Sequence, residues 1–162
     1  MMEFMLSARF LLENANVDWG DLVWAYERQL ISWKDLVEIA QQKVGLRKAS
    51  LLEVKLSNVG KDNSWSAFDI ASKLIRGPIS EEFIKKKWLY LCLLYVYRLN
   101  VSNGEKLSFV ESIYAEFDYP DEISGFIRYI PPAPDDAYDP SLHSIEENER
   151  HLFKKMTNFL NS

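Results

Sequence analysis

The chain has 162 residues and a formal net charge of −5; 48% of its residues are hydrophobic, 27% are charged, and it contains six glycines and six prolines. This length matches one domain, this composition excludes a disordered chain, and the acidic balance argues against a nucleic-acid ligand, because phosphate backbones bind clustered lysines and arginines. The only cysteine, Cys92, has no partner for an intramolecular disulfide or a cysteine-based zinc site and indicates a reducing compartment.

The first twelve residues lack the pattern of an export signal. Glu3 stands where a signal peptide carries positive charge, and Arg9 interrupts the apolar stretch. The most apolar run of the chain, residues 88–97, has about half the length that a membrane span needs. We therefore expect a cytoplasmic protein with no membrane partner, in which this run forms a buried helix.

Capping residues and apolar spacing predict helices in the first part of the chain. One helix is expected over residues 18–28; a second begins at Ser32, where Asp35 completes a capping box, and stops near Gly45. The short link between these two helices predicts an antiparallel hairpin.

The next segments are less regular. Residues 50–59 fit a short helix or a strand about equally, and we predict a helix there. Residues 60–63 are expected to form a loop, after which a helix opens at Ser64 and ends at Gly77-Pro78.

The rest of the chain also predicts helices. They are a helix from Ser80 to about residue 99, an amphipathic helix after Asn103-Gly104, a short helix with Pro120 in its first turn and, after an extended segment over residues 131–134, a last helix from Ser141 or Ser144 to the end. The predicted fold class is therefore all-α, a single-domain bundle of six to eight helices over residues 1–162.

The negative charge is concentrated in one segment. Residues 111–139 carry eight acids and one base, Arg128, a net charge of −7, whereas the remaining residues carry sixteen acids and eighteen bases, a net charge of +2. The acids of the segment are Glu111, Glu116, Asp118, Asp121, Glu122, Asp135, Asp136 and Asp139. Such a segment suits a basic partner.

Two constellations have the residue types of chemical sites. His143, Glu147 and His151 recur every four residues, which places three potential zinc ligands on one face of a helix. A charged surface stripe on a terminal helix explains the same residues, and we favour that interpretation.

The second constellation consists of Asp118, Asp121 and Glu122, which could divide acid and base roles. Each also has a structural role as a cap or helix-dipole partner beside Pro120. Because no phosphate-binding loop, nucleophile elbow or Ser–His pairing accompanies them, we expect no enzyme, no catalytic residues, no metal, no cofactor and no small-molecule substrate.

Aromatic residues are abundant and divide into two groups. Four tryptophans near helix starts are interpreted as packing anchors: Trp19, Trp33, Trp65 and Trp88. Three tyrosines interleaved with acids and prolines are predicted to be exposed: Tyr119, Tyr129 and Tyr138. Tyrosine is favoured at protein interfaces, so these residues predict a binding surface.

A late segment of the chain resembles the signature stretch of a bacterial family of small uncharacterised helical proteins, a domain of unknown function. It comprises residues 113–123, IYAEFDYPDEI, and continues to residues 126–132, FIRYIPP. Members of that family often have a tryptophan-containing helical hairpin near the start, similar to residues 19–36. The resemblance implies kinship with immunity proteins of contact-dependent growth inhibition and other polymorphic toxin systems, which bind and neutralise one cognate toxin domain in the cytoplasm.

These observations lead to a functional hypothesis with two alternatives. The hypothesis is an immunity protein that binds a basic toxin domain, such as a nuclease, through an acidic surface. The alternatives are a non-catalytic adaptor or homo-oligomeric scaffold, which light scattering would reveal, and a metal-dependent enzyme, which elemental analysis would reveal. The predicted partner-binding residues are Glu116, Asp118, Tyr119, Asp121, Glu122, Tyr129, Asp135, Asp136, Tyr138 and Asp139.

Overall fold

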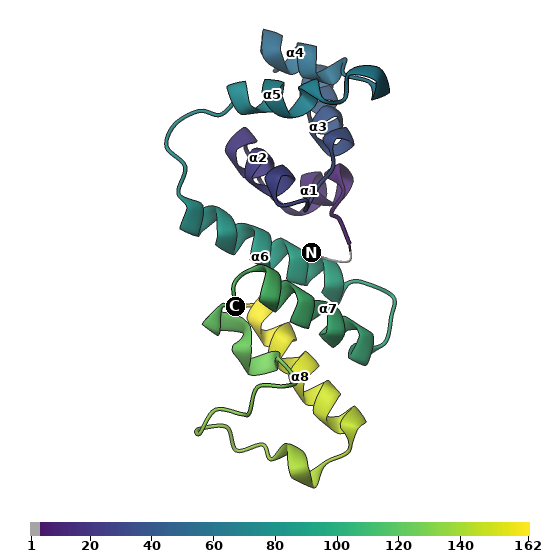
Figure 1. Cartoon of the computed structure of the whole chain (residues 1–162). Coiled ribbons are helices and arrows are strands. Elements are labelled where there is room, and N and C mark those ends of the chain that lie inside the picture. Colours follow the sequence, from purple (N-terminus) through teal and green to yellow (C-terminus); the bar gives the residue numbers. More distant parts are fainter. Residues whose placement is uncertain (1–3) are drawn as a thin grey trace. The chain divides into compact units, whose positions relative to one another are not determined.

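The structure, a computed structural model, describes residues 4–162; residues 1–3, which belong to the segment considered for an export signal, lie outside the described residues. Residues 4–162 form eight α-helices and three short 3-10 helices and contain no strand (Figure 1). The predicted all-α class is therefore confirmed, and the number of α-helices lies within the predicted six to eight. None of these helices combines the length and the hydropathy that crossing a bilayer requires.

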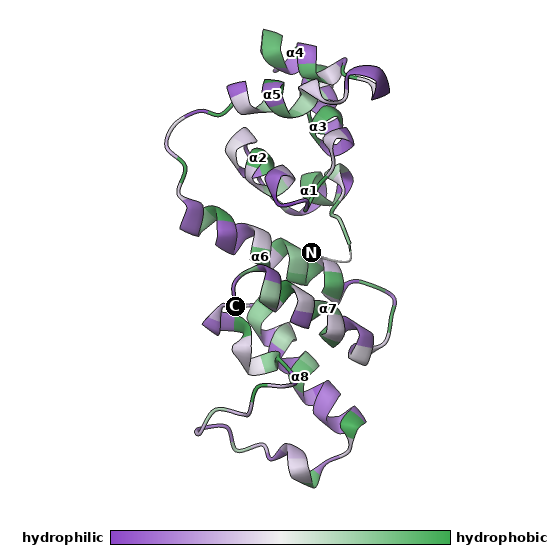
Figure 2. Ribbon diagram, viewed as in Figure 1, coloured by the Kyte–Doolittle hydropathy of each residue, from purple (hydrophilic) through white to green (hydrophobic). Residues whose placement is uncertain are grey.

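The chain divides into two compact units, Phe4–Leu91 and Cys92–Ser162, and the boundary falls inside helix α6 (Glu81–Tyr97). The middle of α6 is hydrophobic and its start is hydrophilic, as Figure 2 shows. Cys92 is free and buried there, as its position in the apolar run indicated. The prediction of one domain over residues 1–162 stays a prediction.

The N-terminal unit contains α1 (Ala8–Asn14), α2 (Trp19–Glu27), α3 (Trp33–Gly45), α4 (Leu51–Ser57), the 3-10 helix η1 (Lys61–Asn63), α5 (Ser66–Lys73) and the first part of α6. Helix α2 starts after Asp18 and α3 starts after Ser32 with Asp35 in a capping box, as predicted, and α3 ends at Gly45; Asp18 and Asp21 form a capping box as well. A further capping box at Ser50 starts α4, so the helix predicted for this ambiguous segment is confirmed.

One helix of this unit was missed, and two expectations for the unit are wrong. Helix α1, which Ser7 caps, was not predicted. Helix α2 packs against α5, whereas α3 packs mainly against α4, so the first two predicted helices do not form a packed hairpin. Their link carries the buried Leu30 and Ile31 and therefore packs as part of the core. Trp65 is 80% exposed and is no packing anchor, whereas Trp19 and Trp88 are buried and Trp33 is half-buried.

A partly buried ion pair connects α2 to α6 within the N-terminal unit. The Asp21 carboxylate, 3% exposed as a residue, accepts a hydrogen bond from Lys87 Nζ at 2.7 Å and one from the Asp18 backbone N–H at 2.9 Å. The Trp88 indole donates to the Asp21 carbonyl at 3.2 Å. Asp21 thus completes the capping box of its own helix and holds α6 at the same time.

The C-terminal unit contains the last part of α6, α7 (Asn103–Glu116), η2 (Asp121–Phe126), η3 (Pro140–Leu142) and α8 (Ile145–Leu160). Helix α8 packs against η2 and α7. The short helix predicted after Pro120 is present as the 3-10 helix η2, and Ser144, one of the two predicted starts, caps α8. Residues 127–139 connect η2 to η3 as a long loop (Figure 1), and Asp136 and Tyr138 in this loop contact residues of α8.

Candidate functional site

The end of α7 turns sharply before η2. Asp118 and Tyr119 both have the left-handed backbone conformation, with φ of 63° and 55°, and the Tyr119 N–H donates to the Tyr114 carbonyl at 2.8 Å. A tyrosine in this conformation is strained by about 1–2 kcal/mol, because its Cβ approaches a carbonyl oxygen that glycine would leave free. The turn nevertheless places Tyr119 at the surface, where its side chain is 56% exposed.

Three tyrosines meet beside this turn, and we call them the tyrosine cluster: Tyr114, Tyr119 and Tyr129. Tyr114 is buried, and its ring contacts Tyr119 edge-on at 5.2 Å between centroids and Tyr129 at 6.4 Å. Tyr129 is 62% exposed, so the predicted exposure of Tyr119 and Tyr129 is confirmed. Partial desolvation and the neighbouring tyrosines raise the pKa of the Tyr129 hydroxyl. Tyr114 belongs to the amphipathic helix predicted after Asn103-Gly104, and sequence reasoning missed that it joins the other two tyrosines.

Three carboxylates at this turn have no side-chain partner among the described residues. Asp118, Asp121 and Glu122 are exposed, and within residues 4–162 their side chains make no ion pair or hydrogen bond. We call them the turn carboxylates. Glu116, the preceding acid of the predicted set, is also exposed. Among the described residues, the charge of the turn carboxylates is therefore not neutralised by a lysine or an arginine.

The remaining predicted acids lie in the connection between η2 and η3 and differ from one another. Asp135 is exposed and, among the described residues, has no side-chain partner. Asp136 is half-buried, accepts from Lys155 Nζ and from the Tyr138 N–H, and has its pKa lowered by Lys155. Asp139 accepts from the Ser141 hydroxyl and N–H, and these bonds lower its pKa. Asp136 thus holds the connection against α8 in addition to any role in binding.

Tyr138 is half-buried, so the prediction that it is exposed is wrong. Its ring is stacked between His143 and His151, at 4.5 and 3.7 Å between centroids, and its hydroxyl donates to Asn148 Oδ1 at 2.8 Å. The third residue of the suggested metal triad, Glu147, lies 3.3 Å from His143 Nδ1. Among the described residues, no three His, Cys, Asp or Glu side chains are grouped so as to hold a metal ion.

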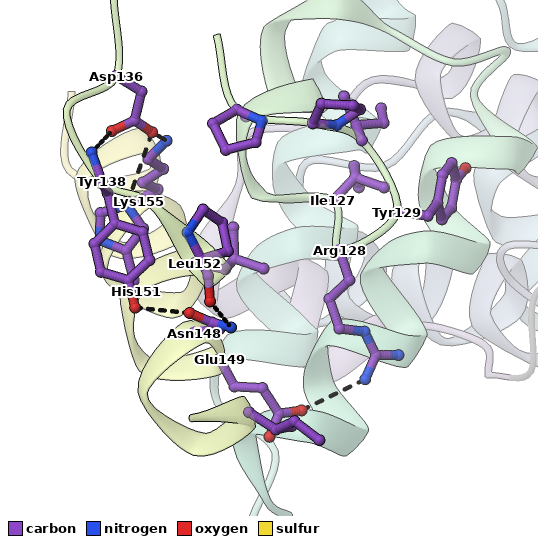
Figure 3. A pocket seen from close by; sticks show the side chains of 16 residues that line it. Ile127, Arg128, Tyr129, Asp136, Tyr138, Asn148, Glu149, His151, Leu152 and Lys155 are labelled. Carbon is purple, nitrogen blue, oxygen red and sulfur yellow. Dashed lines mark hydrogen bonds and ion pairs between the residues drawn. The ribbon is translucent and has the colours of Figure 1, made fainter. Parts of the chain in front are cut away.

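A cavity of about 370 Å³ lies between η2, the following connection and α8 (Figure 3). We call it the C-terminal cavity; it is lined by Gly125, Ile127, Arg128, Tyr129, Ile130, Pro131, Pro132, Asp136, Tyr138, Pro140, Ile145, Asn148, Glu149, His151, Leu152 and Lys155. Three predicted partner-binding residues, Tyr129, Asp136 and Tyr138, therefore line one cavity. Because Tyr129 also belongs to the tyrosine cluster, the cluster and the cavity are continuous.

Ion pairs on both sides fix the shape of the cavity. On one side Lys155 pairs with Asp136, and on the other Arg128 pairs with Glu149 at 3.4 Å (Figure 3). Arg128 also bonds Glu111 at 2.7 Å, and these carboxylates raise the pKa of its guanidinium. These pairs join residues far apart in the sequence, and the only signal for them was Arg128, the single base of the acidic segment.

Comparison with known proteins places the chain in a family. Neither the curated proteins nor the solved structures compared with it gave a match. A family model described as "Uncharacterized protein conserved in bacteria (DUF2247)" matches residues 8–162, nearly the whole chain. That match includes α7, η2, the C-terminal cavity and α8. The chain therefore belongs to the bacterial family DUF2247.

Proposed function

We propose that this chain is an immunity protein that binds and neutralises a cognate bacterial toxin domain in the cytoplasm. The observation that carries the proposal is the exposure of Tyr119 and Tyr129 directly beside the turn carboxylates, Asp118, Asp121 and Glu122. The two kinds of side chain support different steps of binding.

The tyrosines support a stable complex. Tyrosine buries a large, rigid surface at little cost in side-chain entropy and is enriched among the residues that dominate binding energy. Tyr119 and Tyr129 already pack against Tyr114, so part of their rotational freedom is lost before a partner arrives. A partner would cover rings that more than half face solvent in the free chain.

The turn carboxylates support rapid association with a basic partner. Uncompensated charge steers diffusional encounter, and the effect weakens as salt screens it. A nuclease domain, whose substrate is a polyanion, presents the complementary basic surface. An inhibitor that docks there would also cover the substrate site.

The combined substitutions Asp118→Asn, Asp121→Asn and Glu122→Gln are expected to slow association with the toxin domain by about tenfold at low salt and by much less at high salt. The dissociation rate should change little, because exposed charges act mainly on encounter. Stopped-flow measurements over a salt series would give both rates; the toxin domain to test is the C-terminal domain of a large secreted protein, if one is encoded immediately upstream.

A matched control removes the same charge from the N-terminal unit. Glu27→Gln, Glu38→Gln and Asp62→Asn alter three exposed acids that have no side-chain partner within residues 4–162. This control should leave the association rate within about twofold of the unaltered chain. Equal slowing by both triple variants would show that net charge acts rather than this surface, and association independent of salt would remove steering altogether.

A further inference from the structure

We infer that the C-terminal cavity receives one apolar side chain, of the size of leucine or phenylalanine, from a cationic segment of the partner protein. This inference rests on the proposed function. It specifies the kind of partner side chain that occupies the C-terminal cavity. The C-terminal cavity would act on the stability of the complex, whereas the turn carboxylates would act on the rate of association.

The lining favours an apolar occupant. Ile127 is a buried residue of the cavity lining, and Leu152 faces the cavity from α8 (Figure 3). Ile145 also lines the cavity and is 78% exposed in the free chain. Pro131 and Pro132 are exposed and line the same hollow. Its volume of about 370 Å³ is near the lower end of the range of roughly 300–1,000 Å³ for ligand pockets. Covering these groups removes apolar surface from water.

The polar groups of the lining are mostly engaged already. Asn148 accepts from the Tyr138 hydroxyl and donates to the Pro140 carbonyl at 3.1 Å. The lining contains one arginine, Arg128, and one lysine, Lys155. Each of them is paired with a carboxylate of this chain. An occupant with a carboxylate or phosphate would have to break one of these pairs, whereas an apolar side chain leaves them intact.

The charge around the hollow favours cationic neighbours of that side chain. Asp135, in the connection that borders the cavity, is exposed and without a side-chain partner in residues 4–162, and within those residues the Asp139 carboxylate accepts hydrogen bonds from Ser141 alone. Beyond Tyr129, the turn carboxylates extend the negative charge. Lysines or arginines flanking the inserted side chain would meet these carboxylates, which is the charge complementarity typical of specific interfaces.

A peptide titration tests the cavity without the toxin. The full chain, labelled with ¹⁵N, would be titrated with Lys-Lys-Phe-Lys-Lys and followed by amide chemical shifts. Shifts are expected at the cavity lining, with affinity about tenfold higher than for Lys-Lys-Ala-Lys-Lys or Glu-Glu-Phe-Glu-Glu. Equal affinity for the alanine peptide would overturn the apolar anchor, and equal affinity for the glutamate peptide would overturn the cationic flanks.

Two variants localise the binding. Ile145→Asn should weaken the phenylalanine peptide about tenfold, whereas Leu142→Asn, at a residue 77% exposed that does not line the cavity, should change it by less than about twofold. Both positions are too exposed for either change to prevent folding. Equal effects of the two variants, or no shifts at the lining, would refute the assignment.

The experiments distinguish a failure of the cavity assignment from a failure of the proposed immunity role. Neutralisation of the toxin by a chain that does not bind the phenylalanine peptide would overturn the cavity assignment alone. Binding of the peptide by a chain that neutralises no toxin would overturn the immunity role and support the cavity as a docking site for a cationic segment.

Discussion

Replacing Tyr119 with alanine is expected to raise the dissociation rate of the complex with the toxin domain by about thirtyfold, which corresponds to about 2 kcal/mol of binding free energy. The physical reason is the loss of a large aromatic surface that is 56% exposed in the free chain and rests on Tyr114. Surface plasmon resonance would measure both rate constants, and the association rate should change little because no charge is removed.

Tyr119→Gly separates binding from folding. Because Tyr119 has a φ of 55°, glycine relieves strain at this position and should keep the free energy of unfolding within about 1 kcal/mol of the unaltered chain. Its dissociation rate should nevertheless rise as much as that of the alanine variant. Trp65→Ala, which removes an aromatic side chain 80% exposed in the N-terminal unit, is the control and should leave binding unchanged. Loss of binding with Trp65→Ala, or none with Tyr119→Gly, would contradict the role of Tyr119.

Asp21→Ala is expected to lower the free energy of unfolding by about 3–5 kcal/mol. The substitution leaves the ammonium of Lys87, whose side chain is 24% exposed, without its carboxylate and removes the acceptor of the Asp18 N–H in the capping box of α2. Urea denaturation followed by tryptophan fluorescence would measure the change.

Two further variants test the cause of that loss. Glu13→Ala breaks the exposed pair with Arg9 and should cost less than about 1 kcal/mol. Adding Lys87→Met to Asp21→Ala should recover part of the lost stability, because the partly buried ammonium, which would keep only the Asn16 carbonyl as an acceptor, is then gone. If Asp21→Ala is as mild as Glu13→Ala, the ion pair does not hold α2 and α6 together.

The helices that could be predicted are those whose signals are local. The side chains of Asp18 and Ser144 accept a hydrogen bond from the backbone N–H three residues later, and Ser32 is followed by an acid, Asp35, at that position. The start of each helix is therefore encoded within one turn. Trp65 shows where this reasoning fails. Whether a tryptophan at a helix start is buried depends on which element packs over it, and the pattern of neighbouring residues does not contain that information.

In the candidate site, too, features with a local sequence signal could be predicted, whereas features that depend on distant residues could not. The exposure of Tyr119 and Tyr129 could be predicted because acids, glycine and prolines surround them in the sequence. The burial of Tyr138 could not, since it depends on His151, thirteen residues later, and on the pairing of Asp136 with Lys155, which brings the connection against α8. Likewise, the cavity exists only because residues from η2, the connection and α8 meet in space.

Growth of bacteria that express the toxin domain alone or together with this chain decides whether the two proteins form a neutralising pair. Co-expression of the unaltered chain should restore growth, and a chain that carries both Tyr119→Gly and the Asp118→Asn, Asp121→Asn and Glu122→Gln changes should fail to do so while remaining folded. Cells that stay inhibited by the toxin in the presence of the unaltered chain, or that the altered chain protects equally well, would contradict binding through the exposed tyrosines and turn carboxylates.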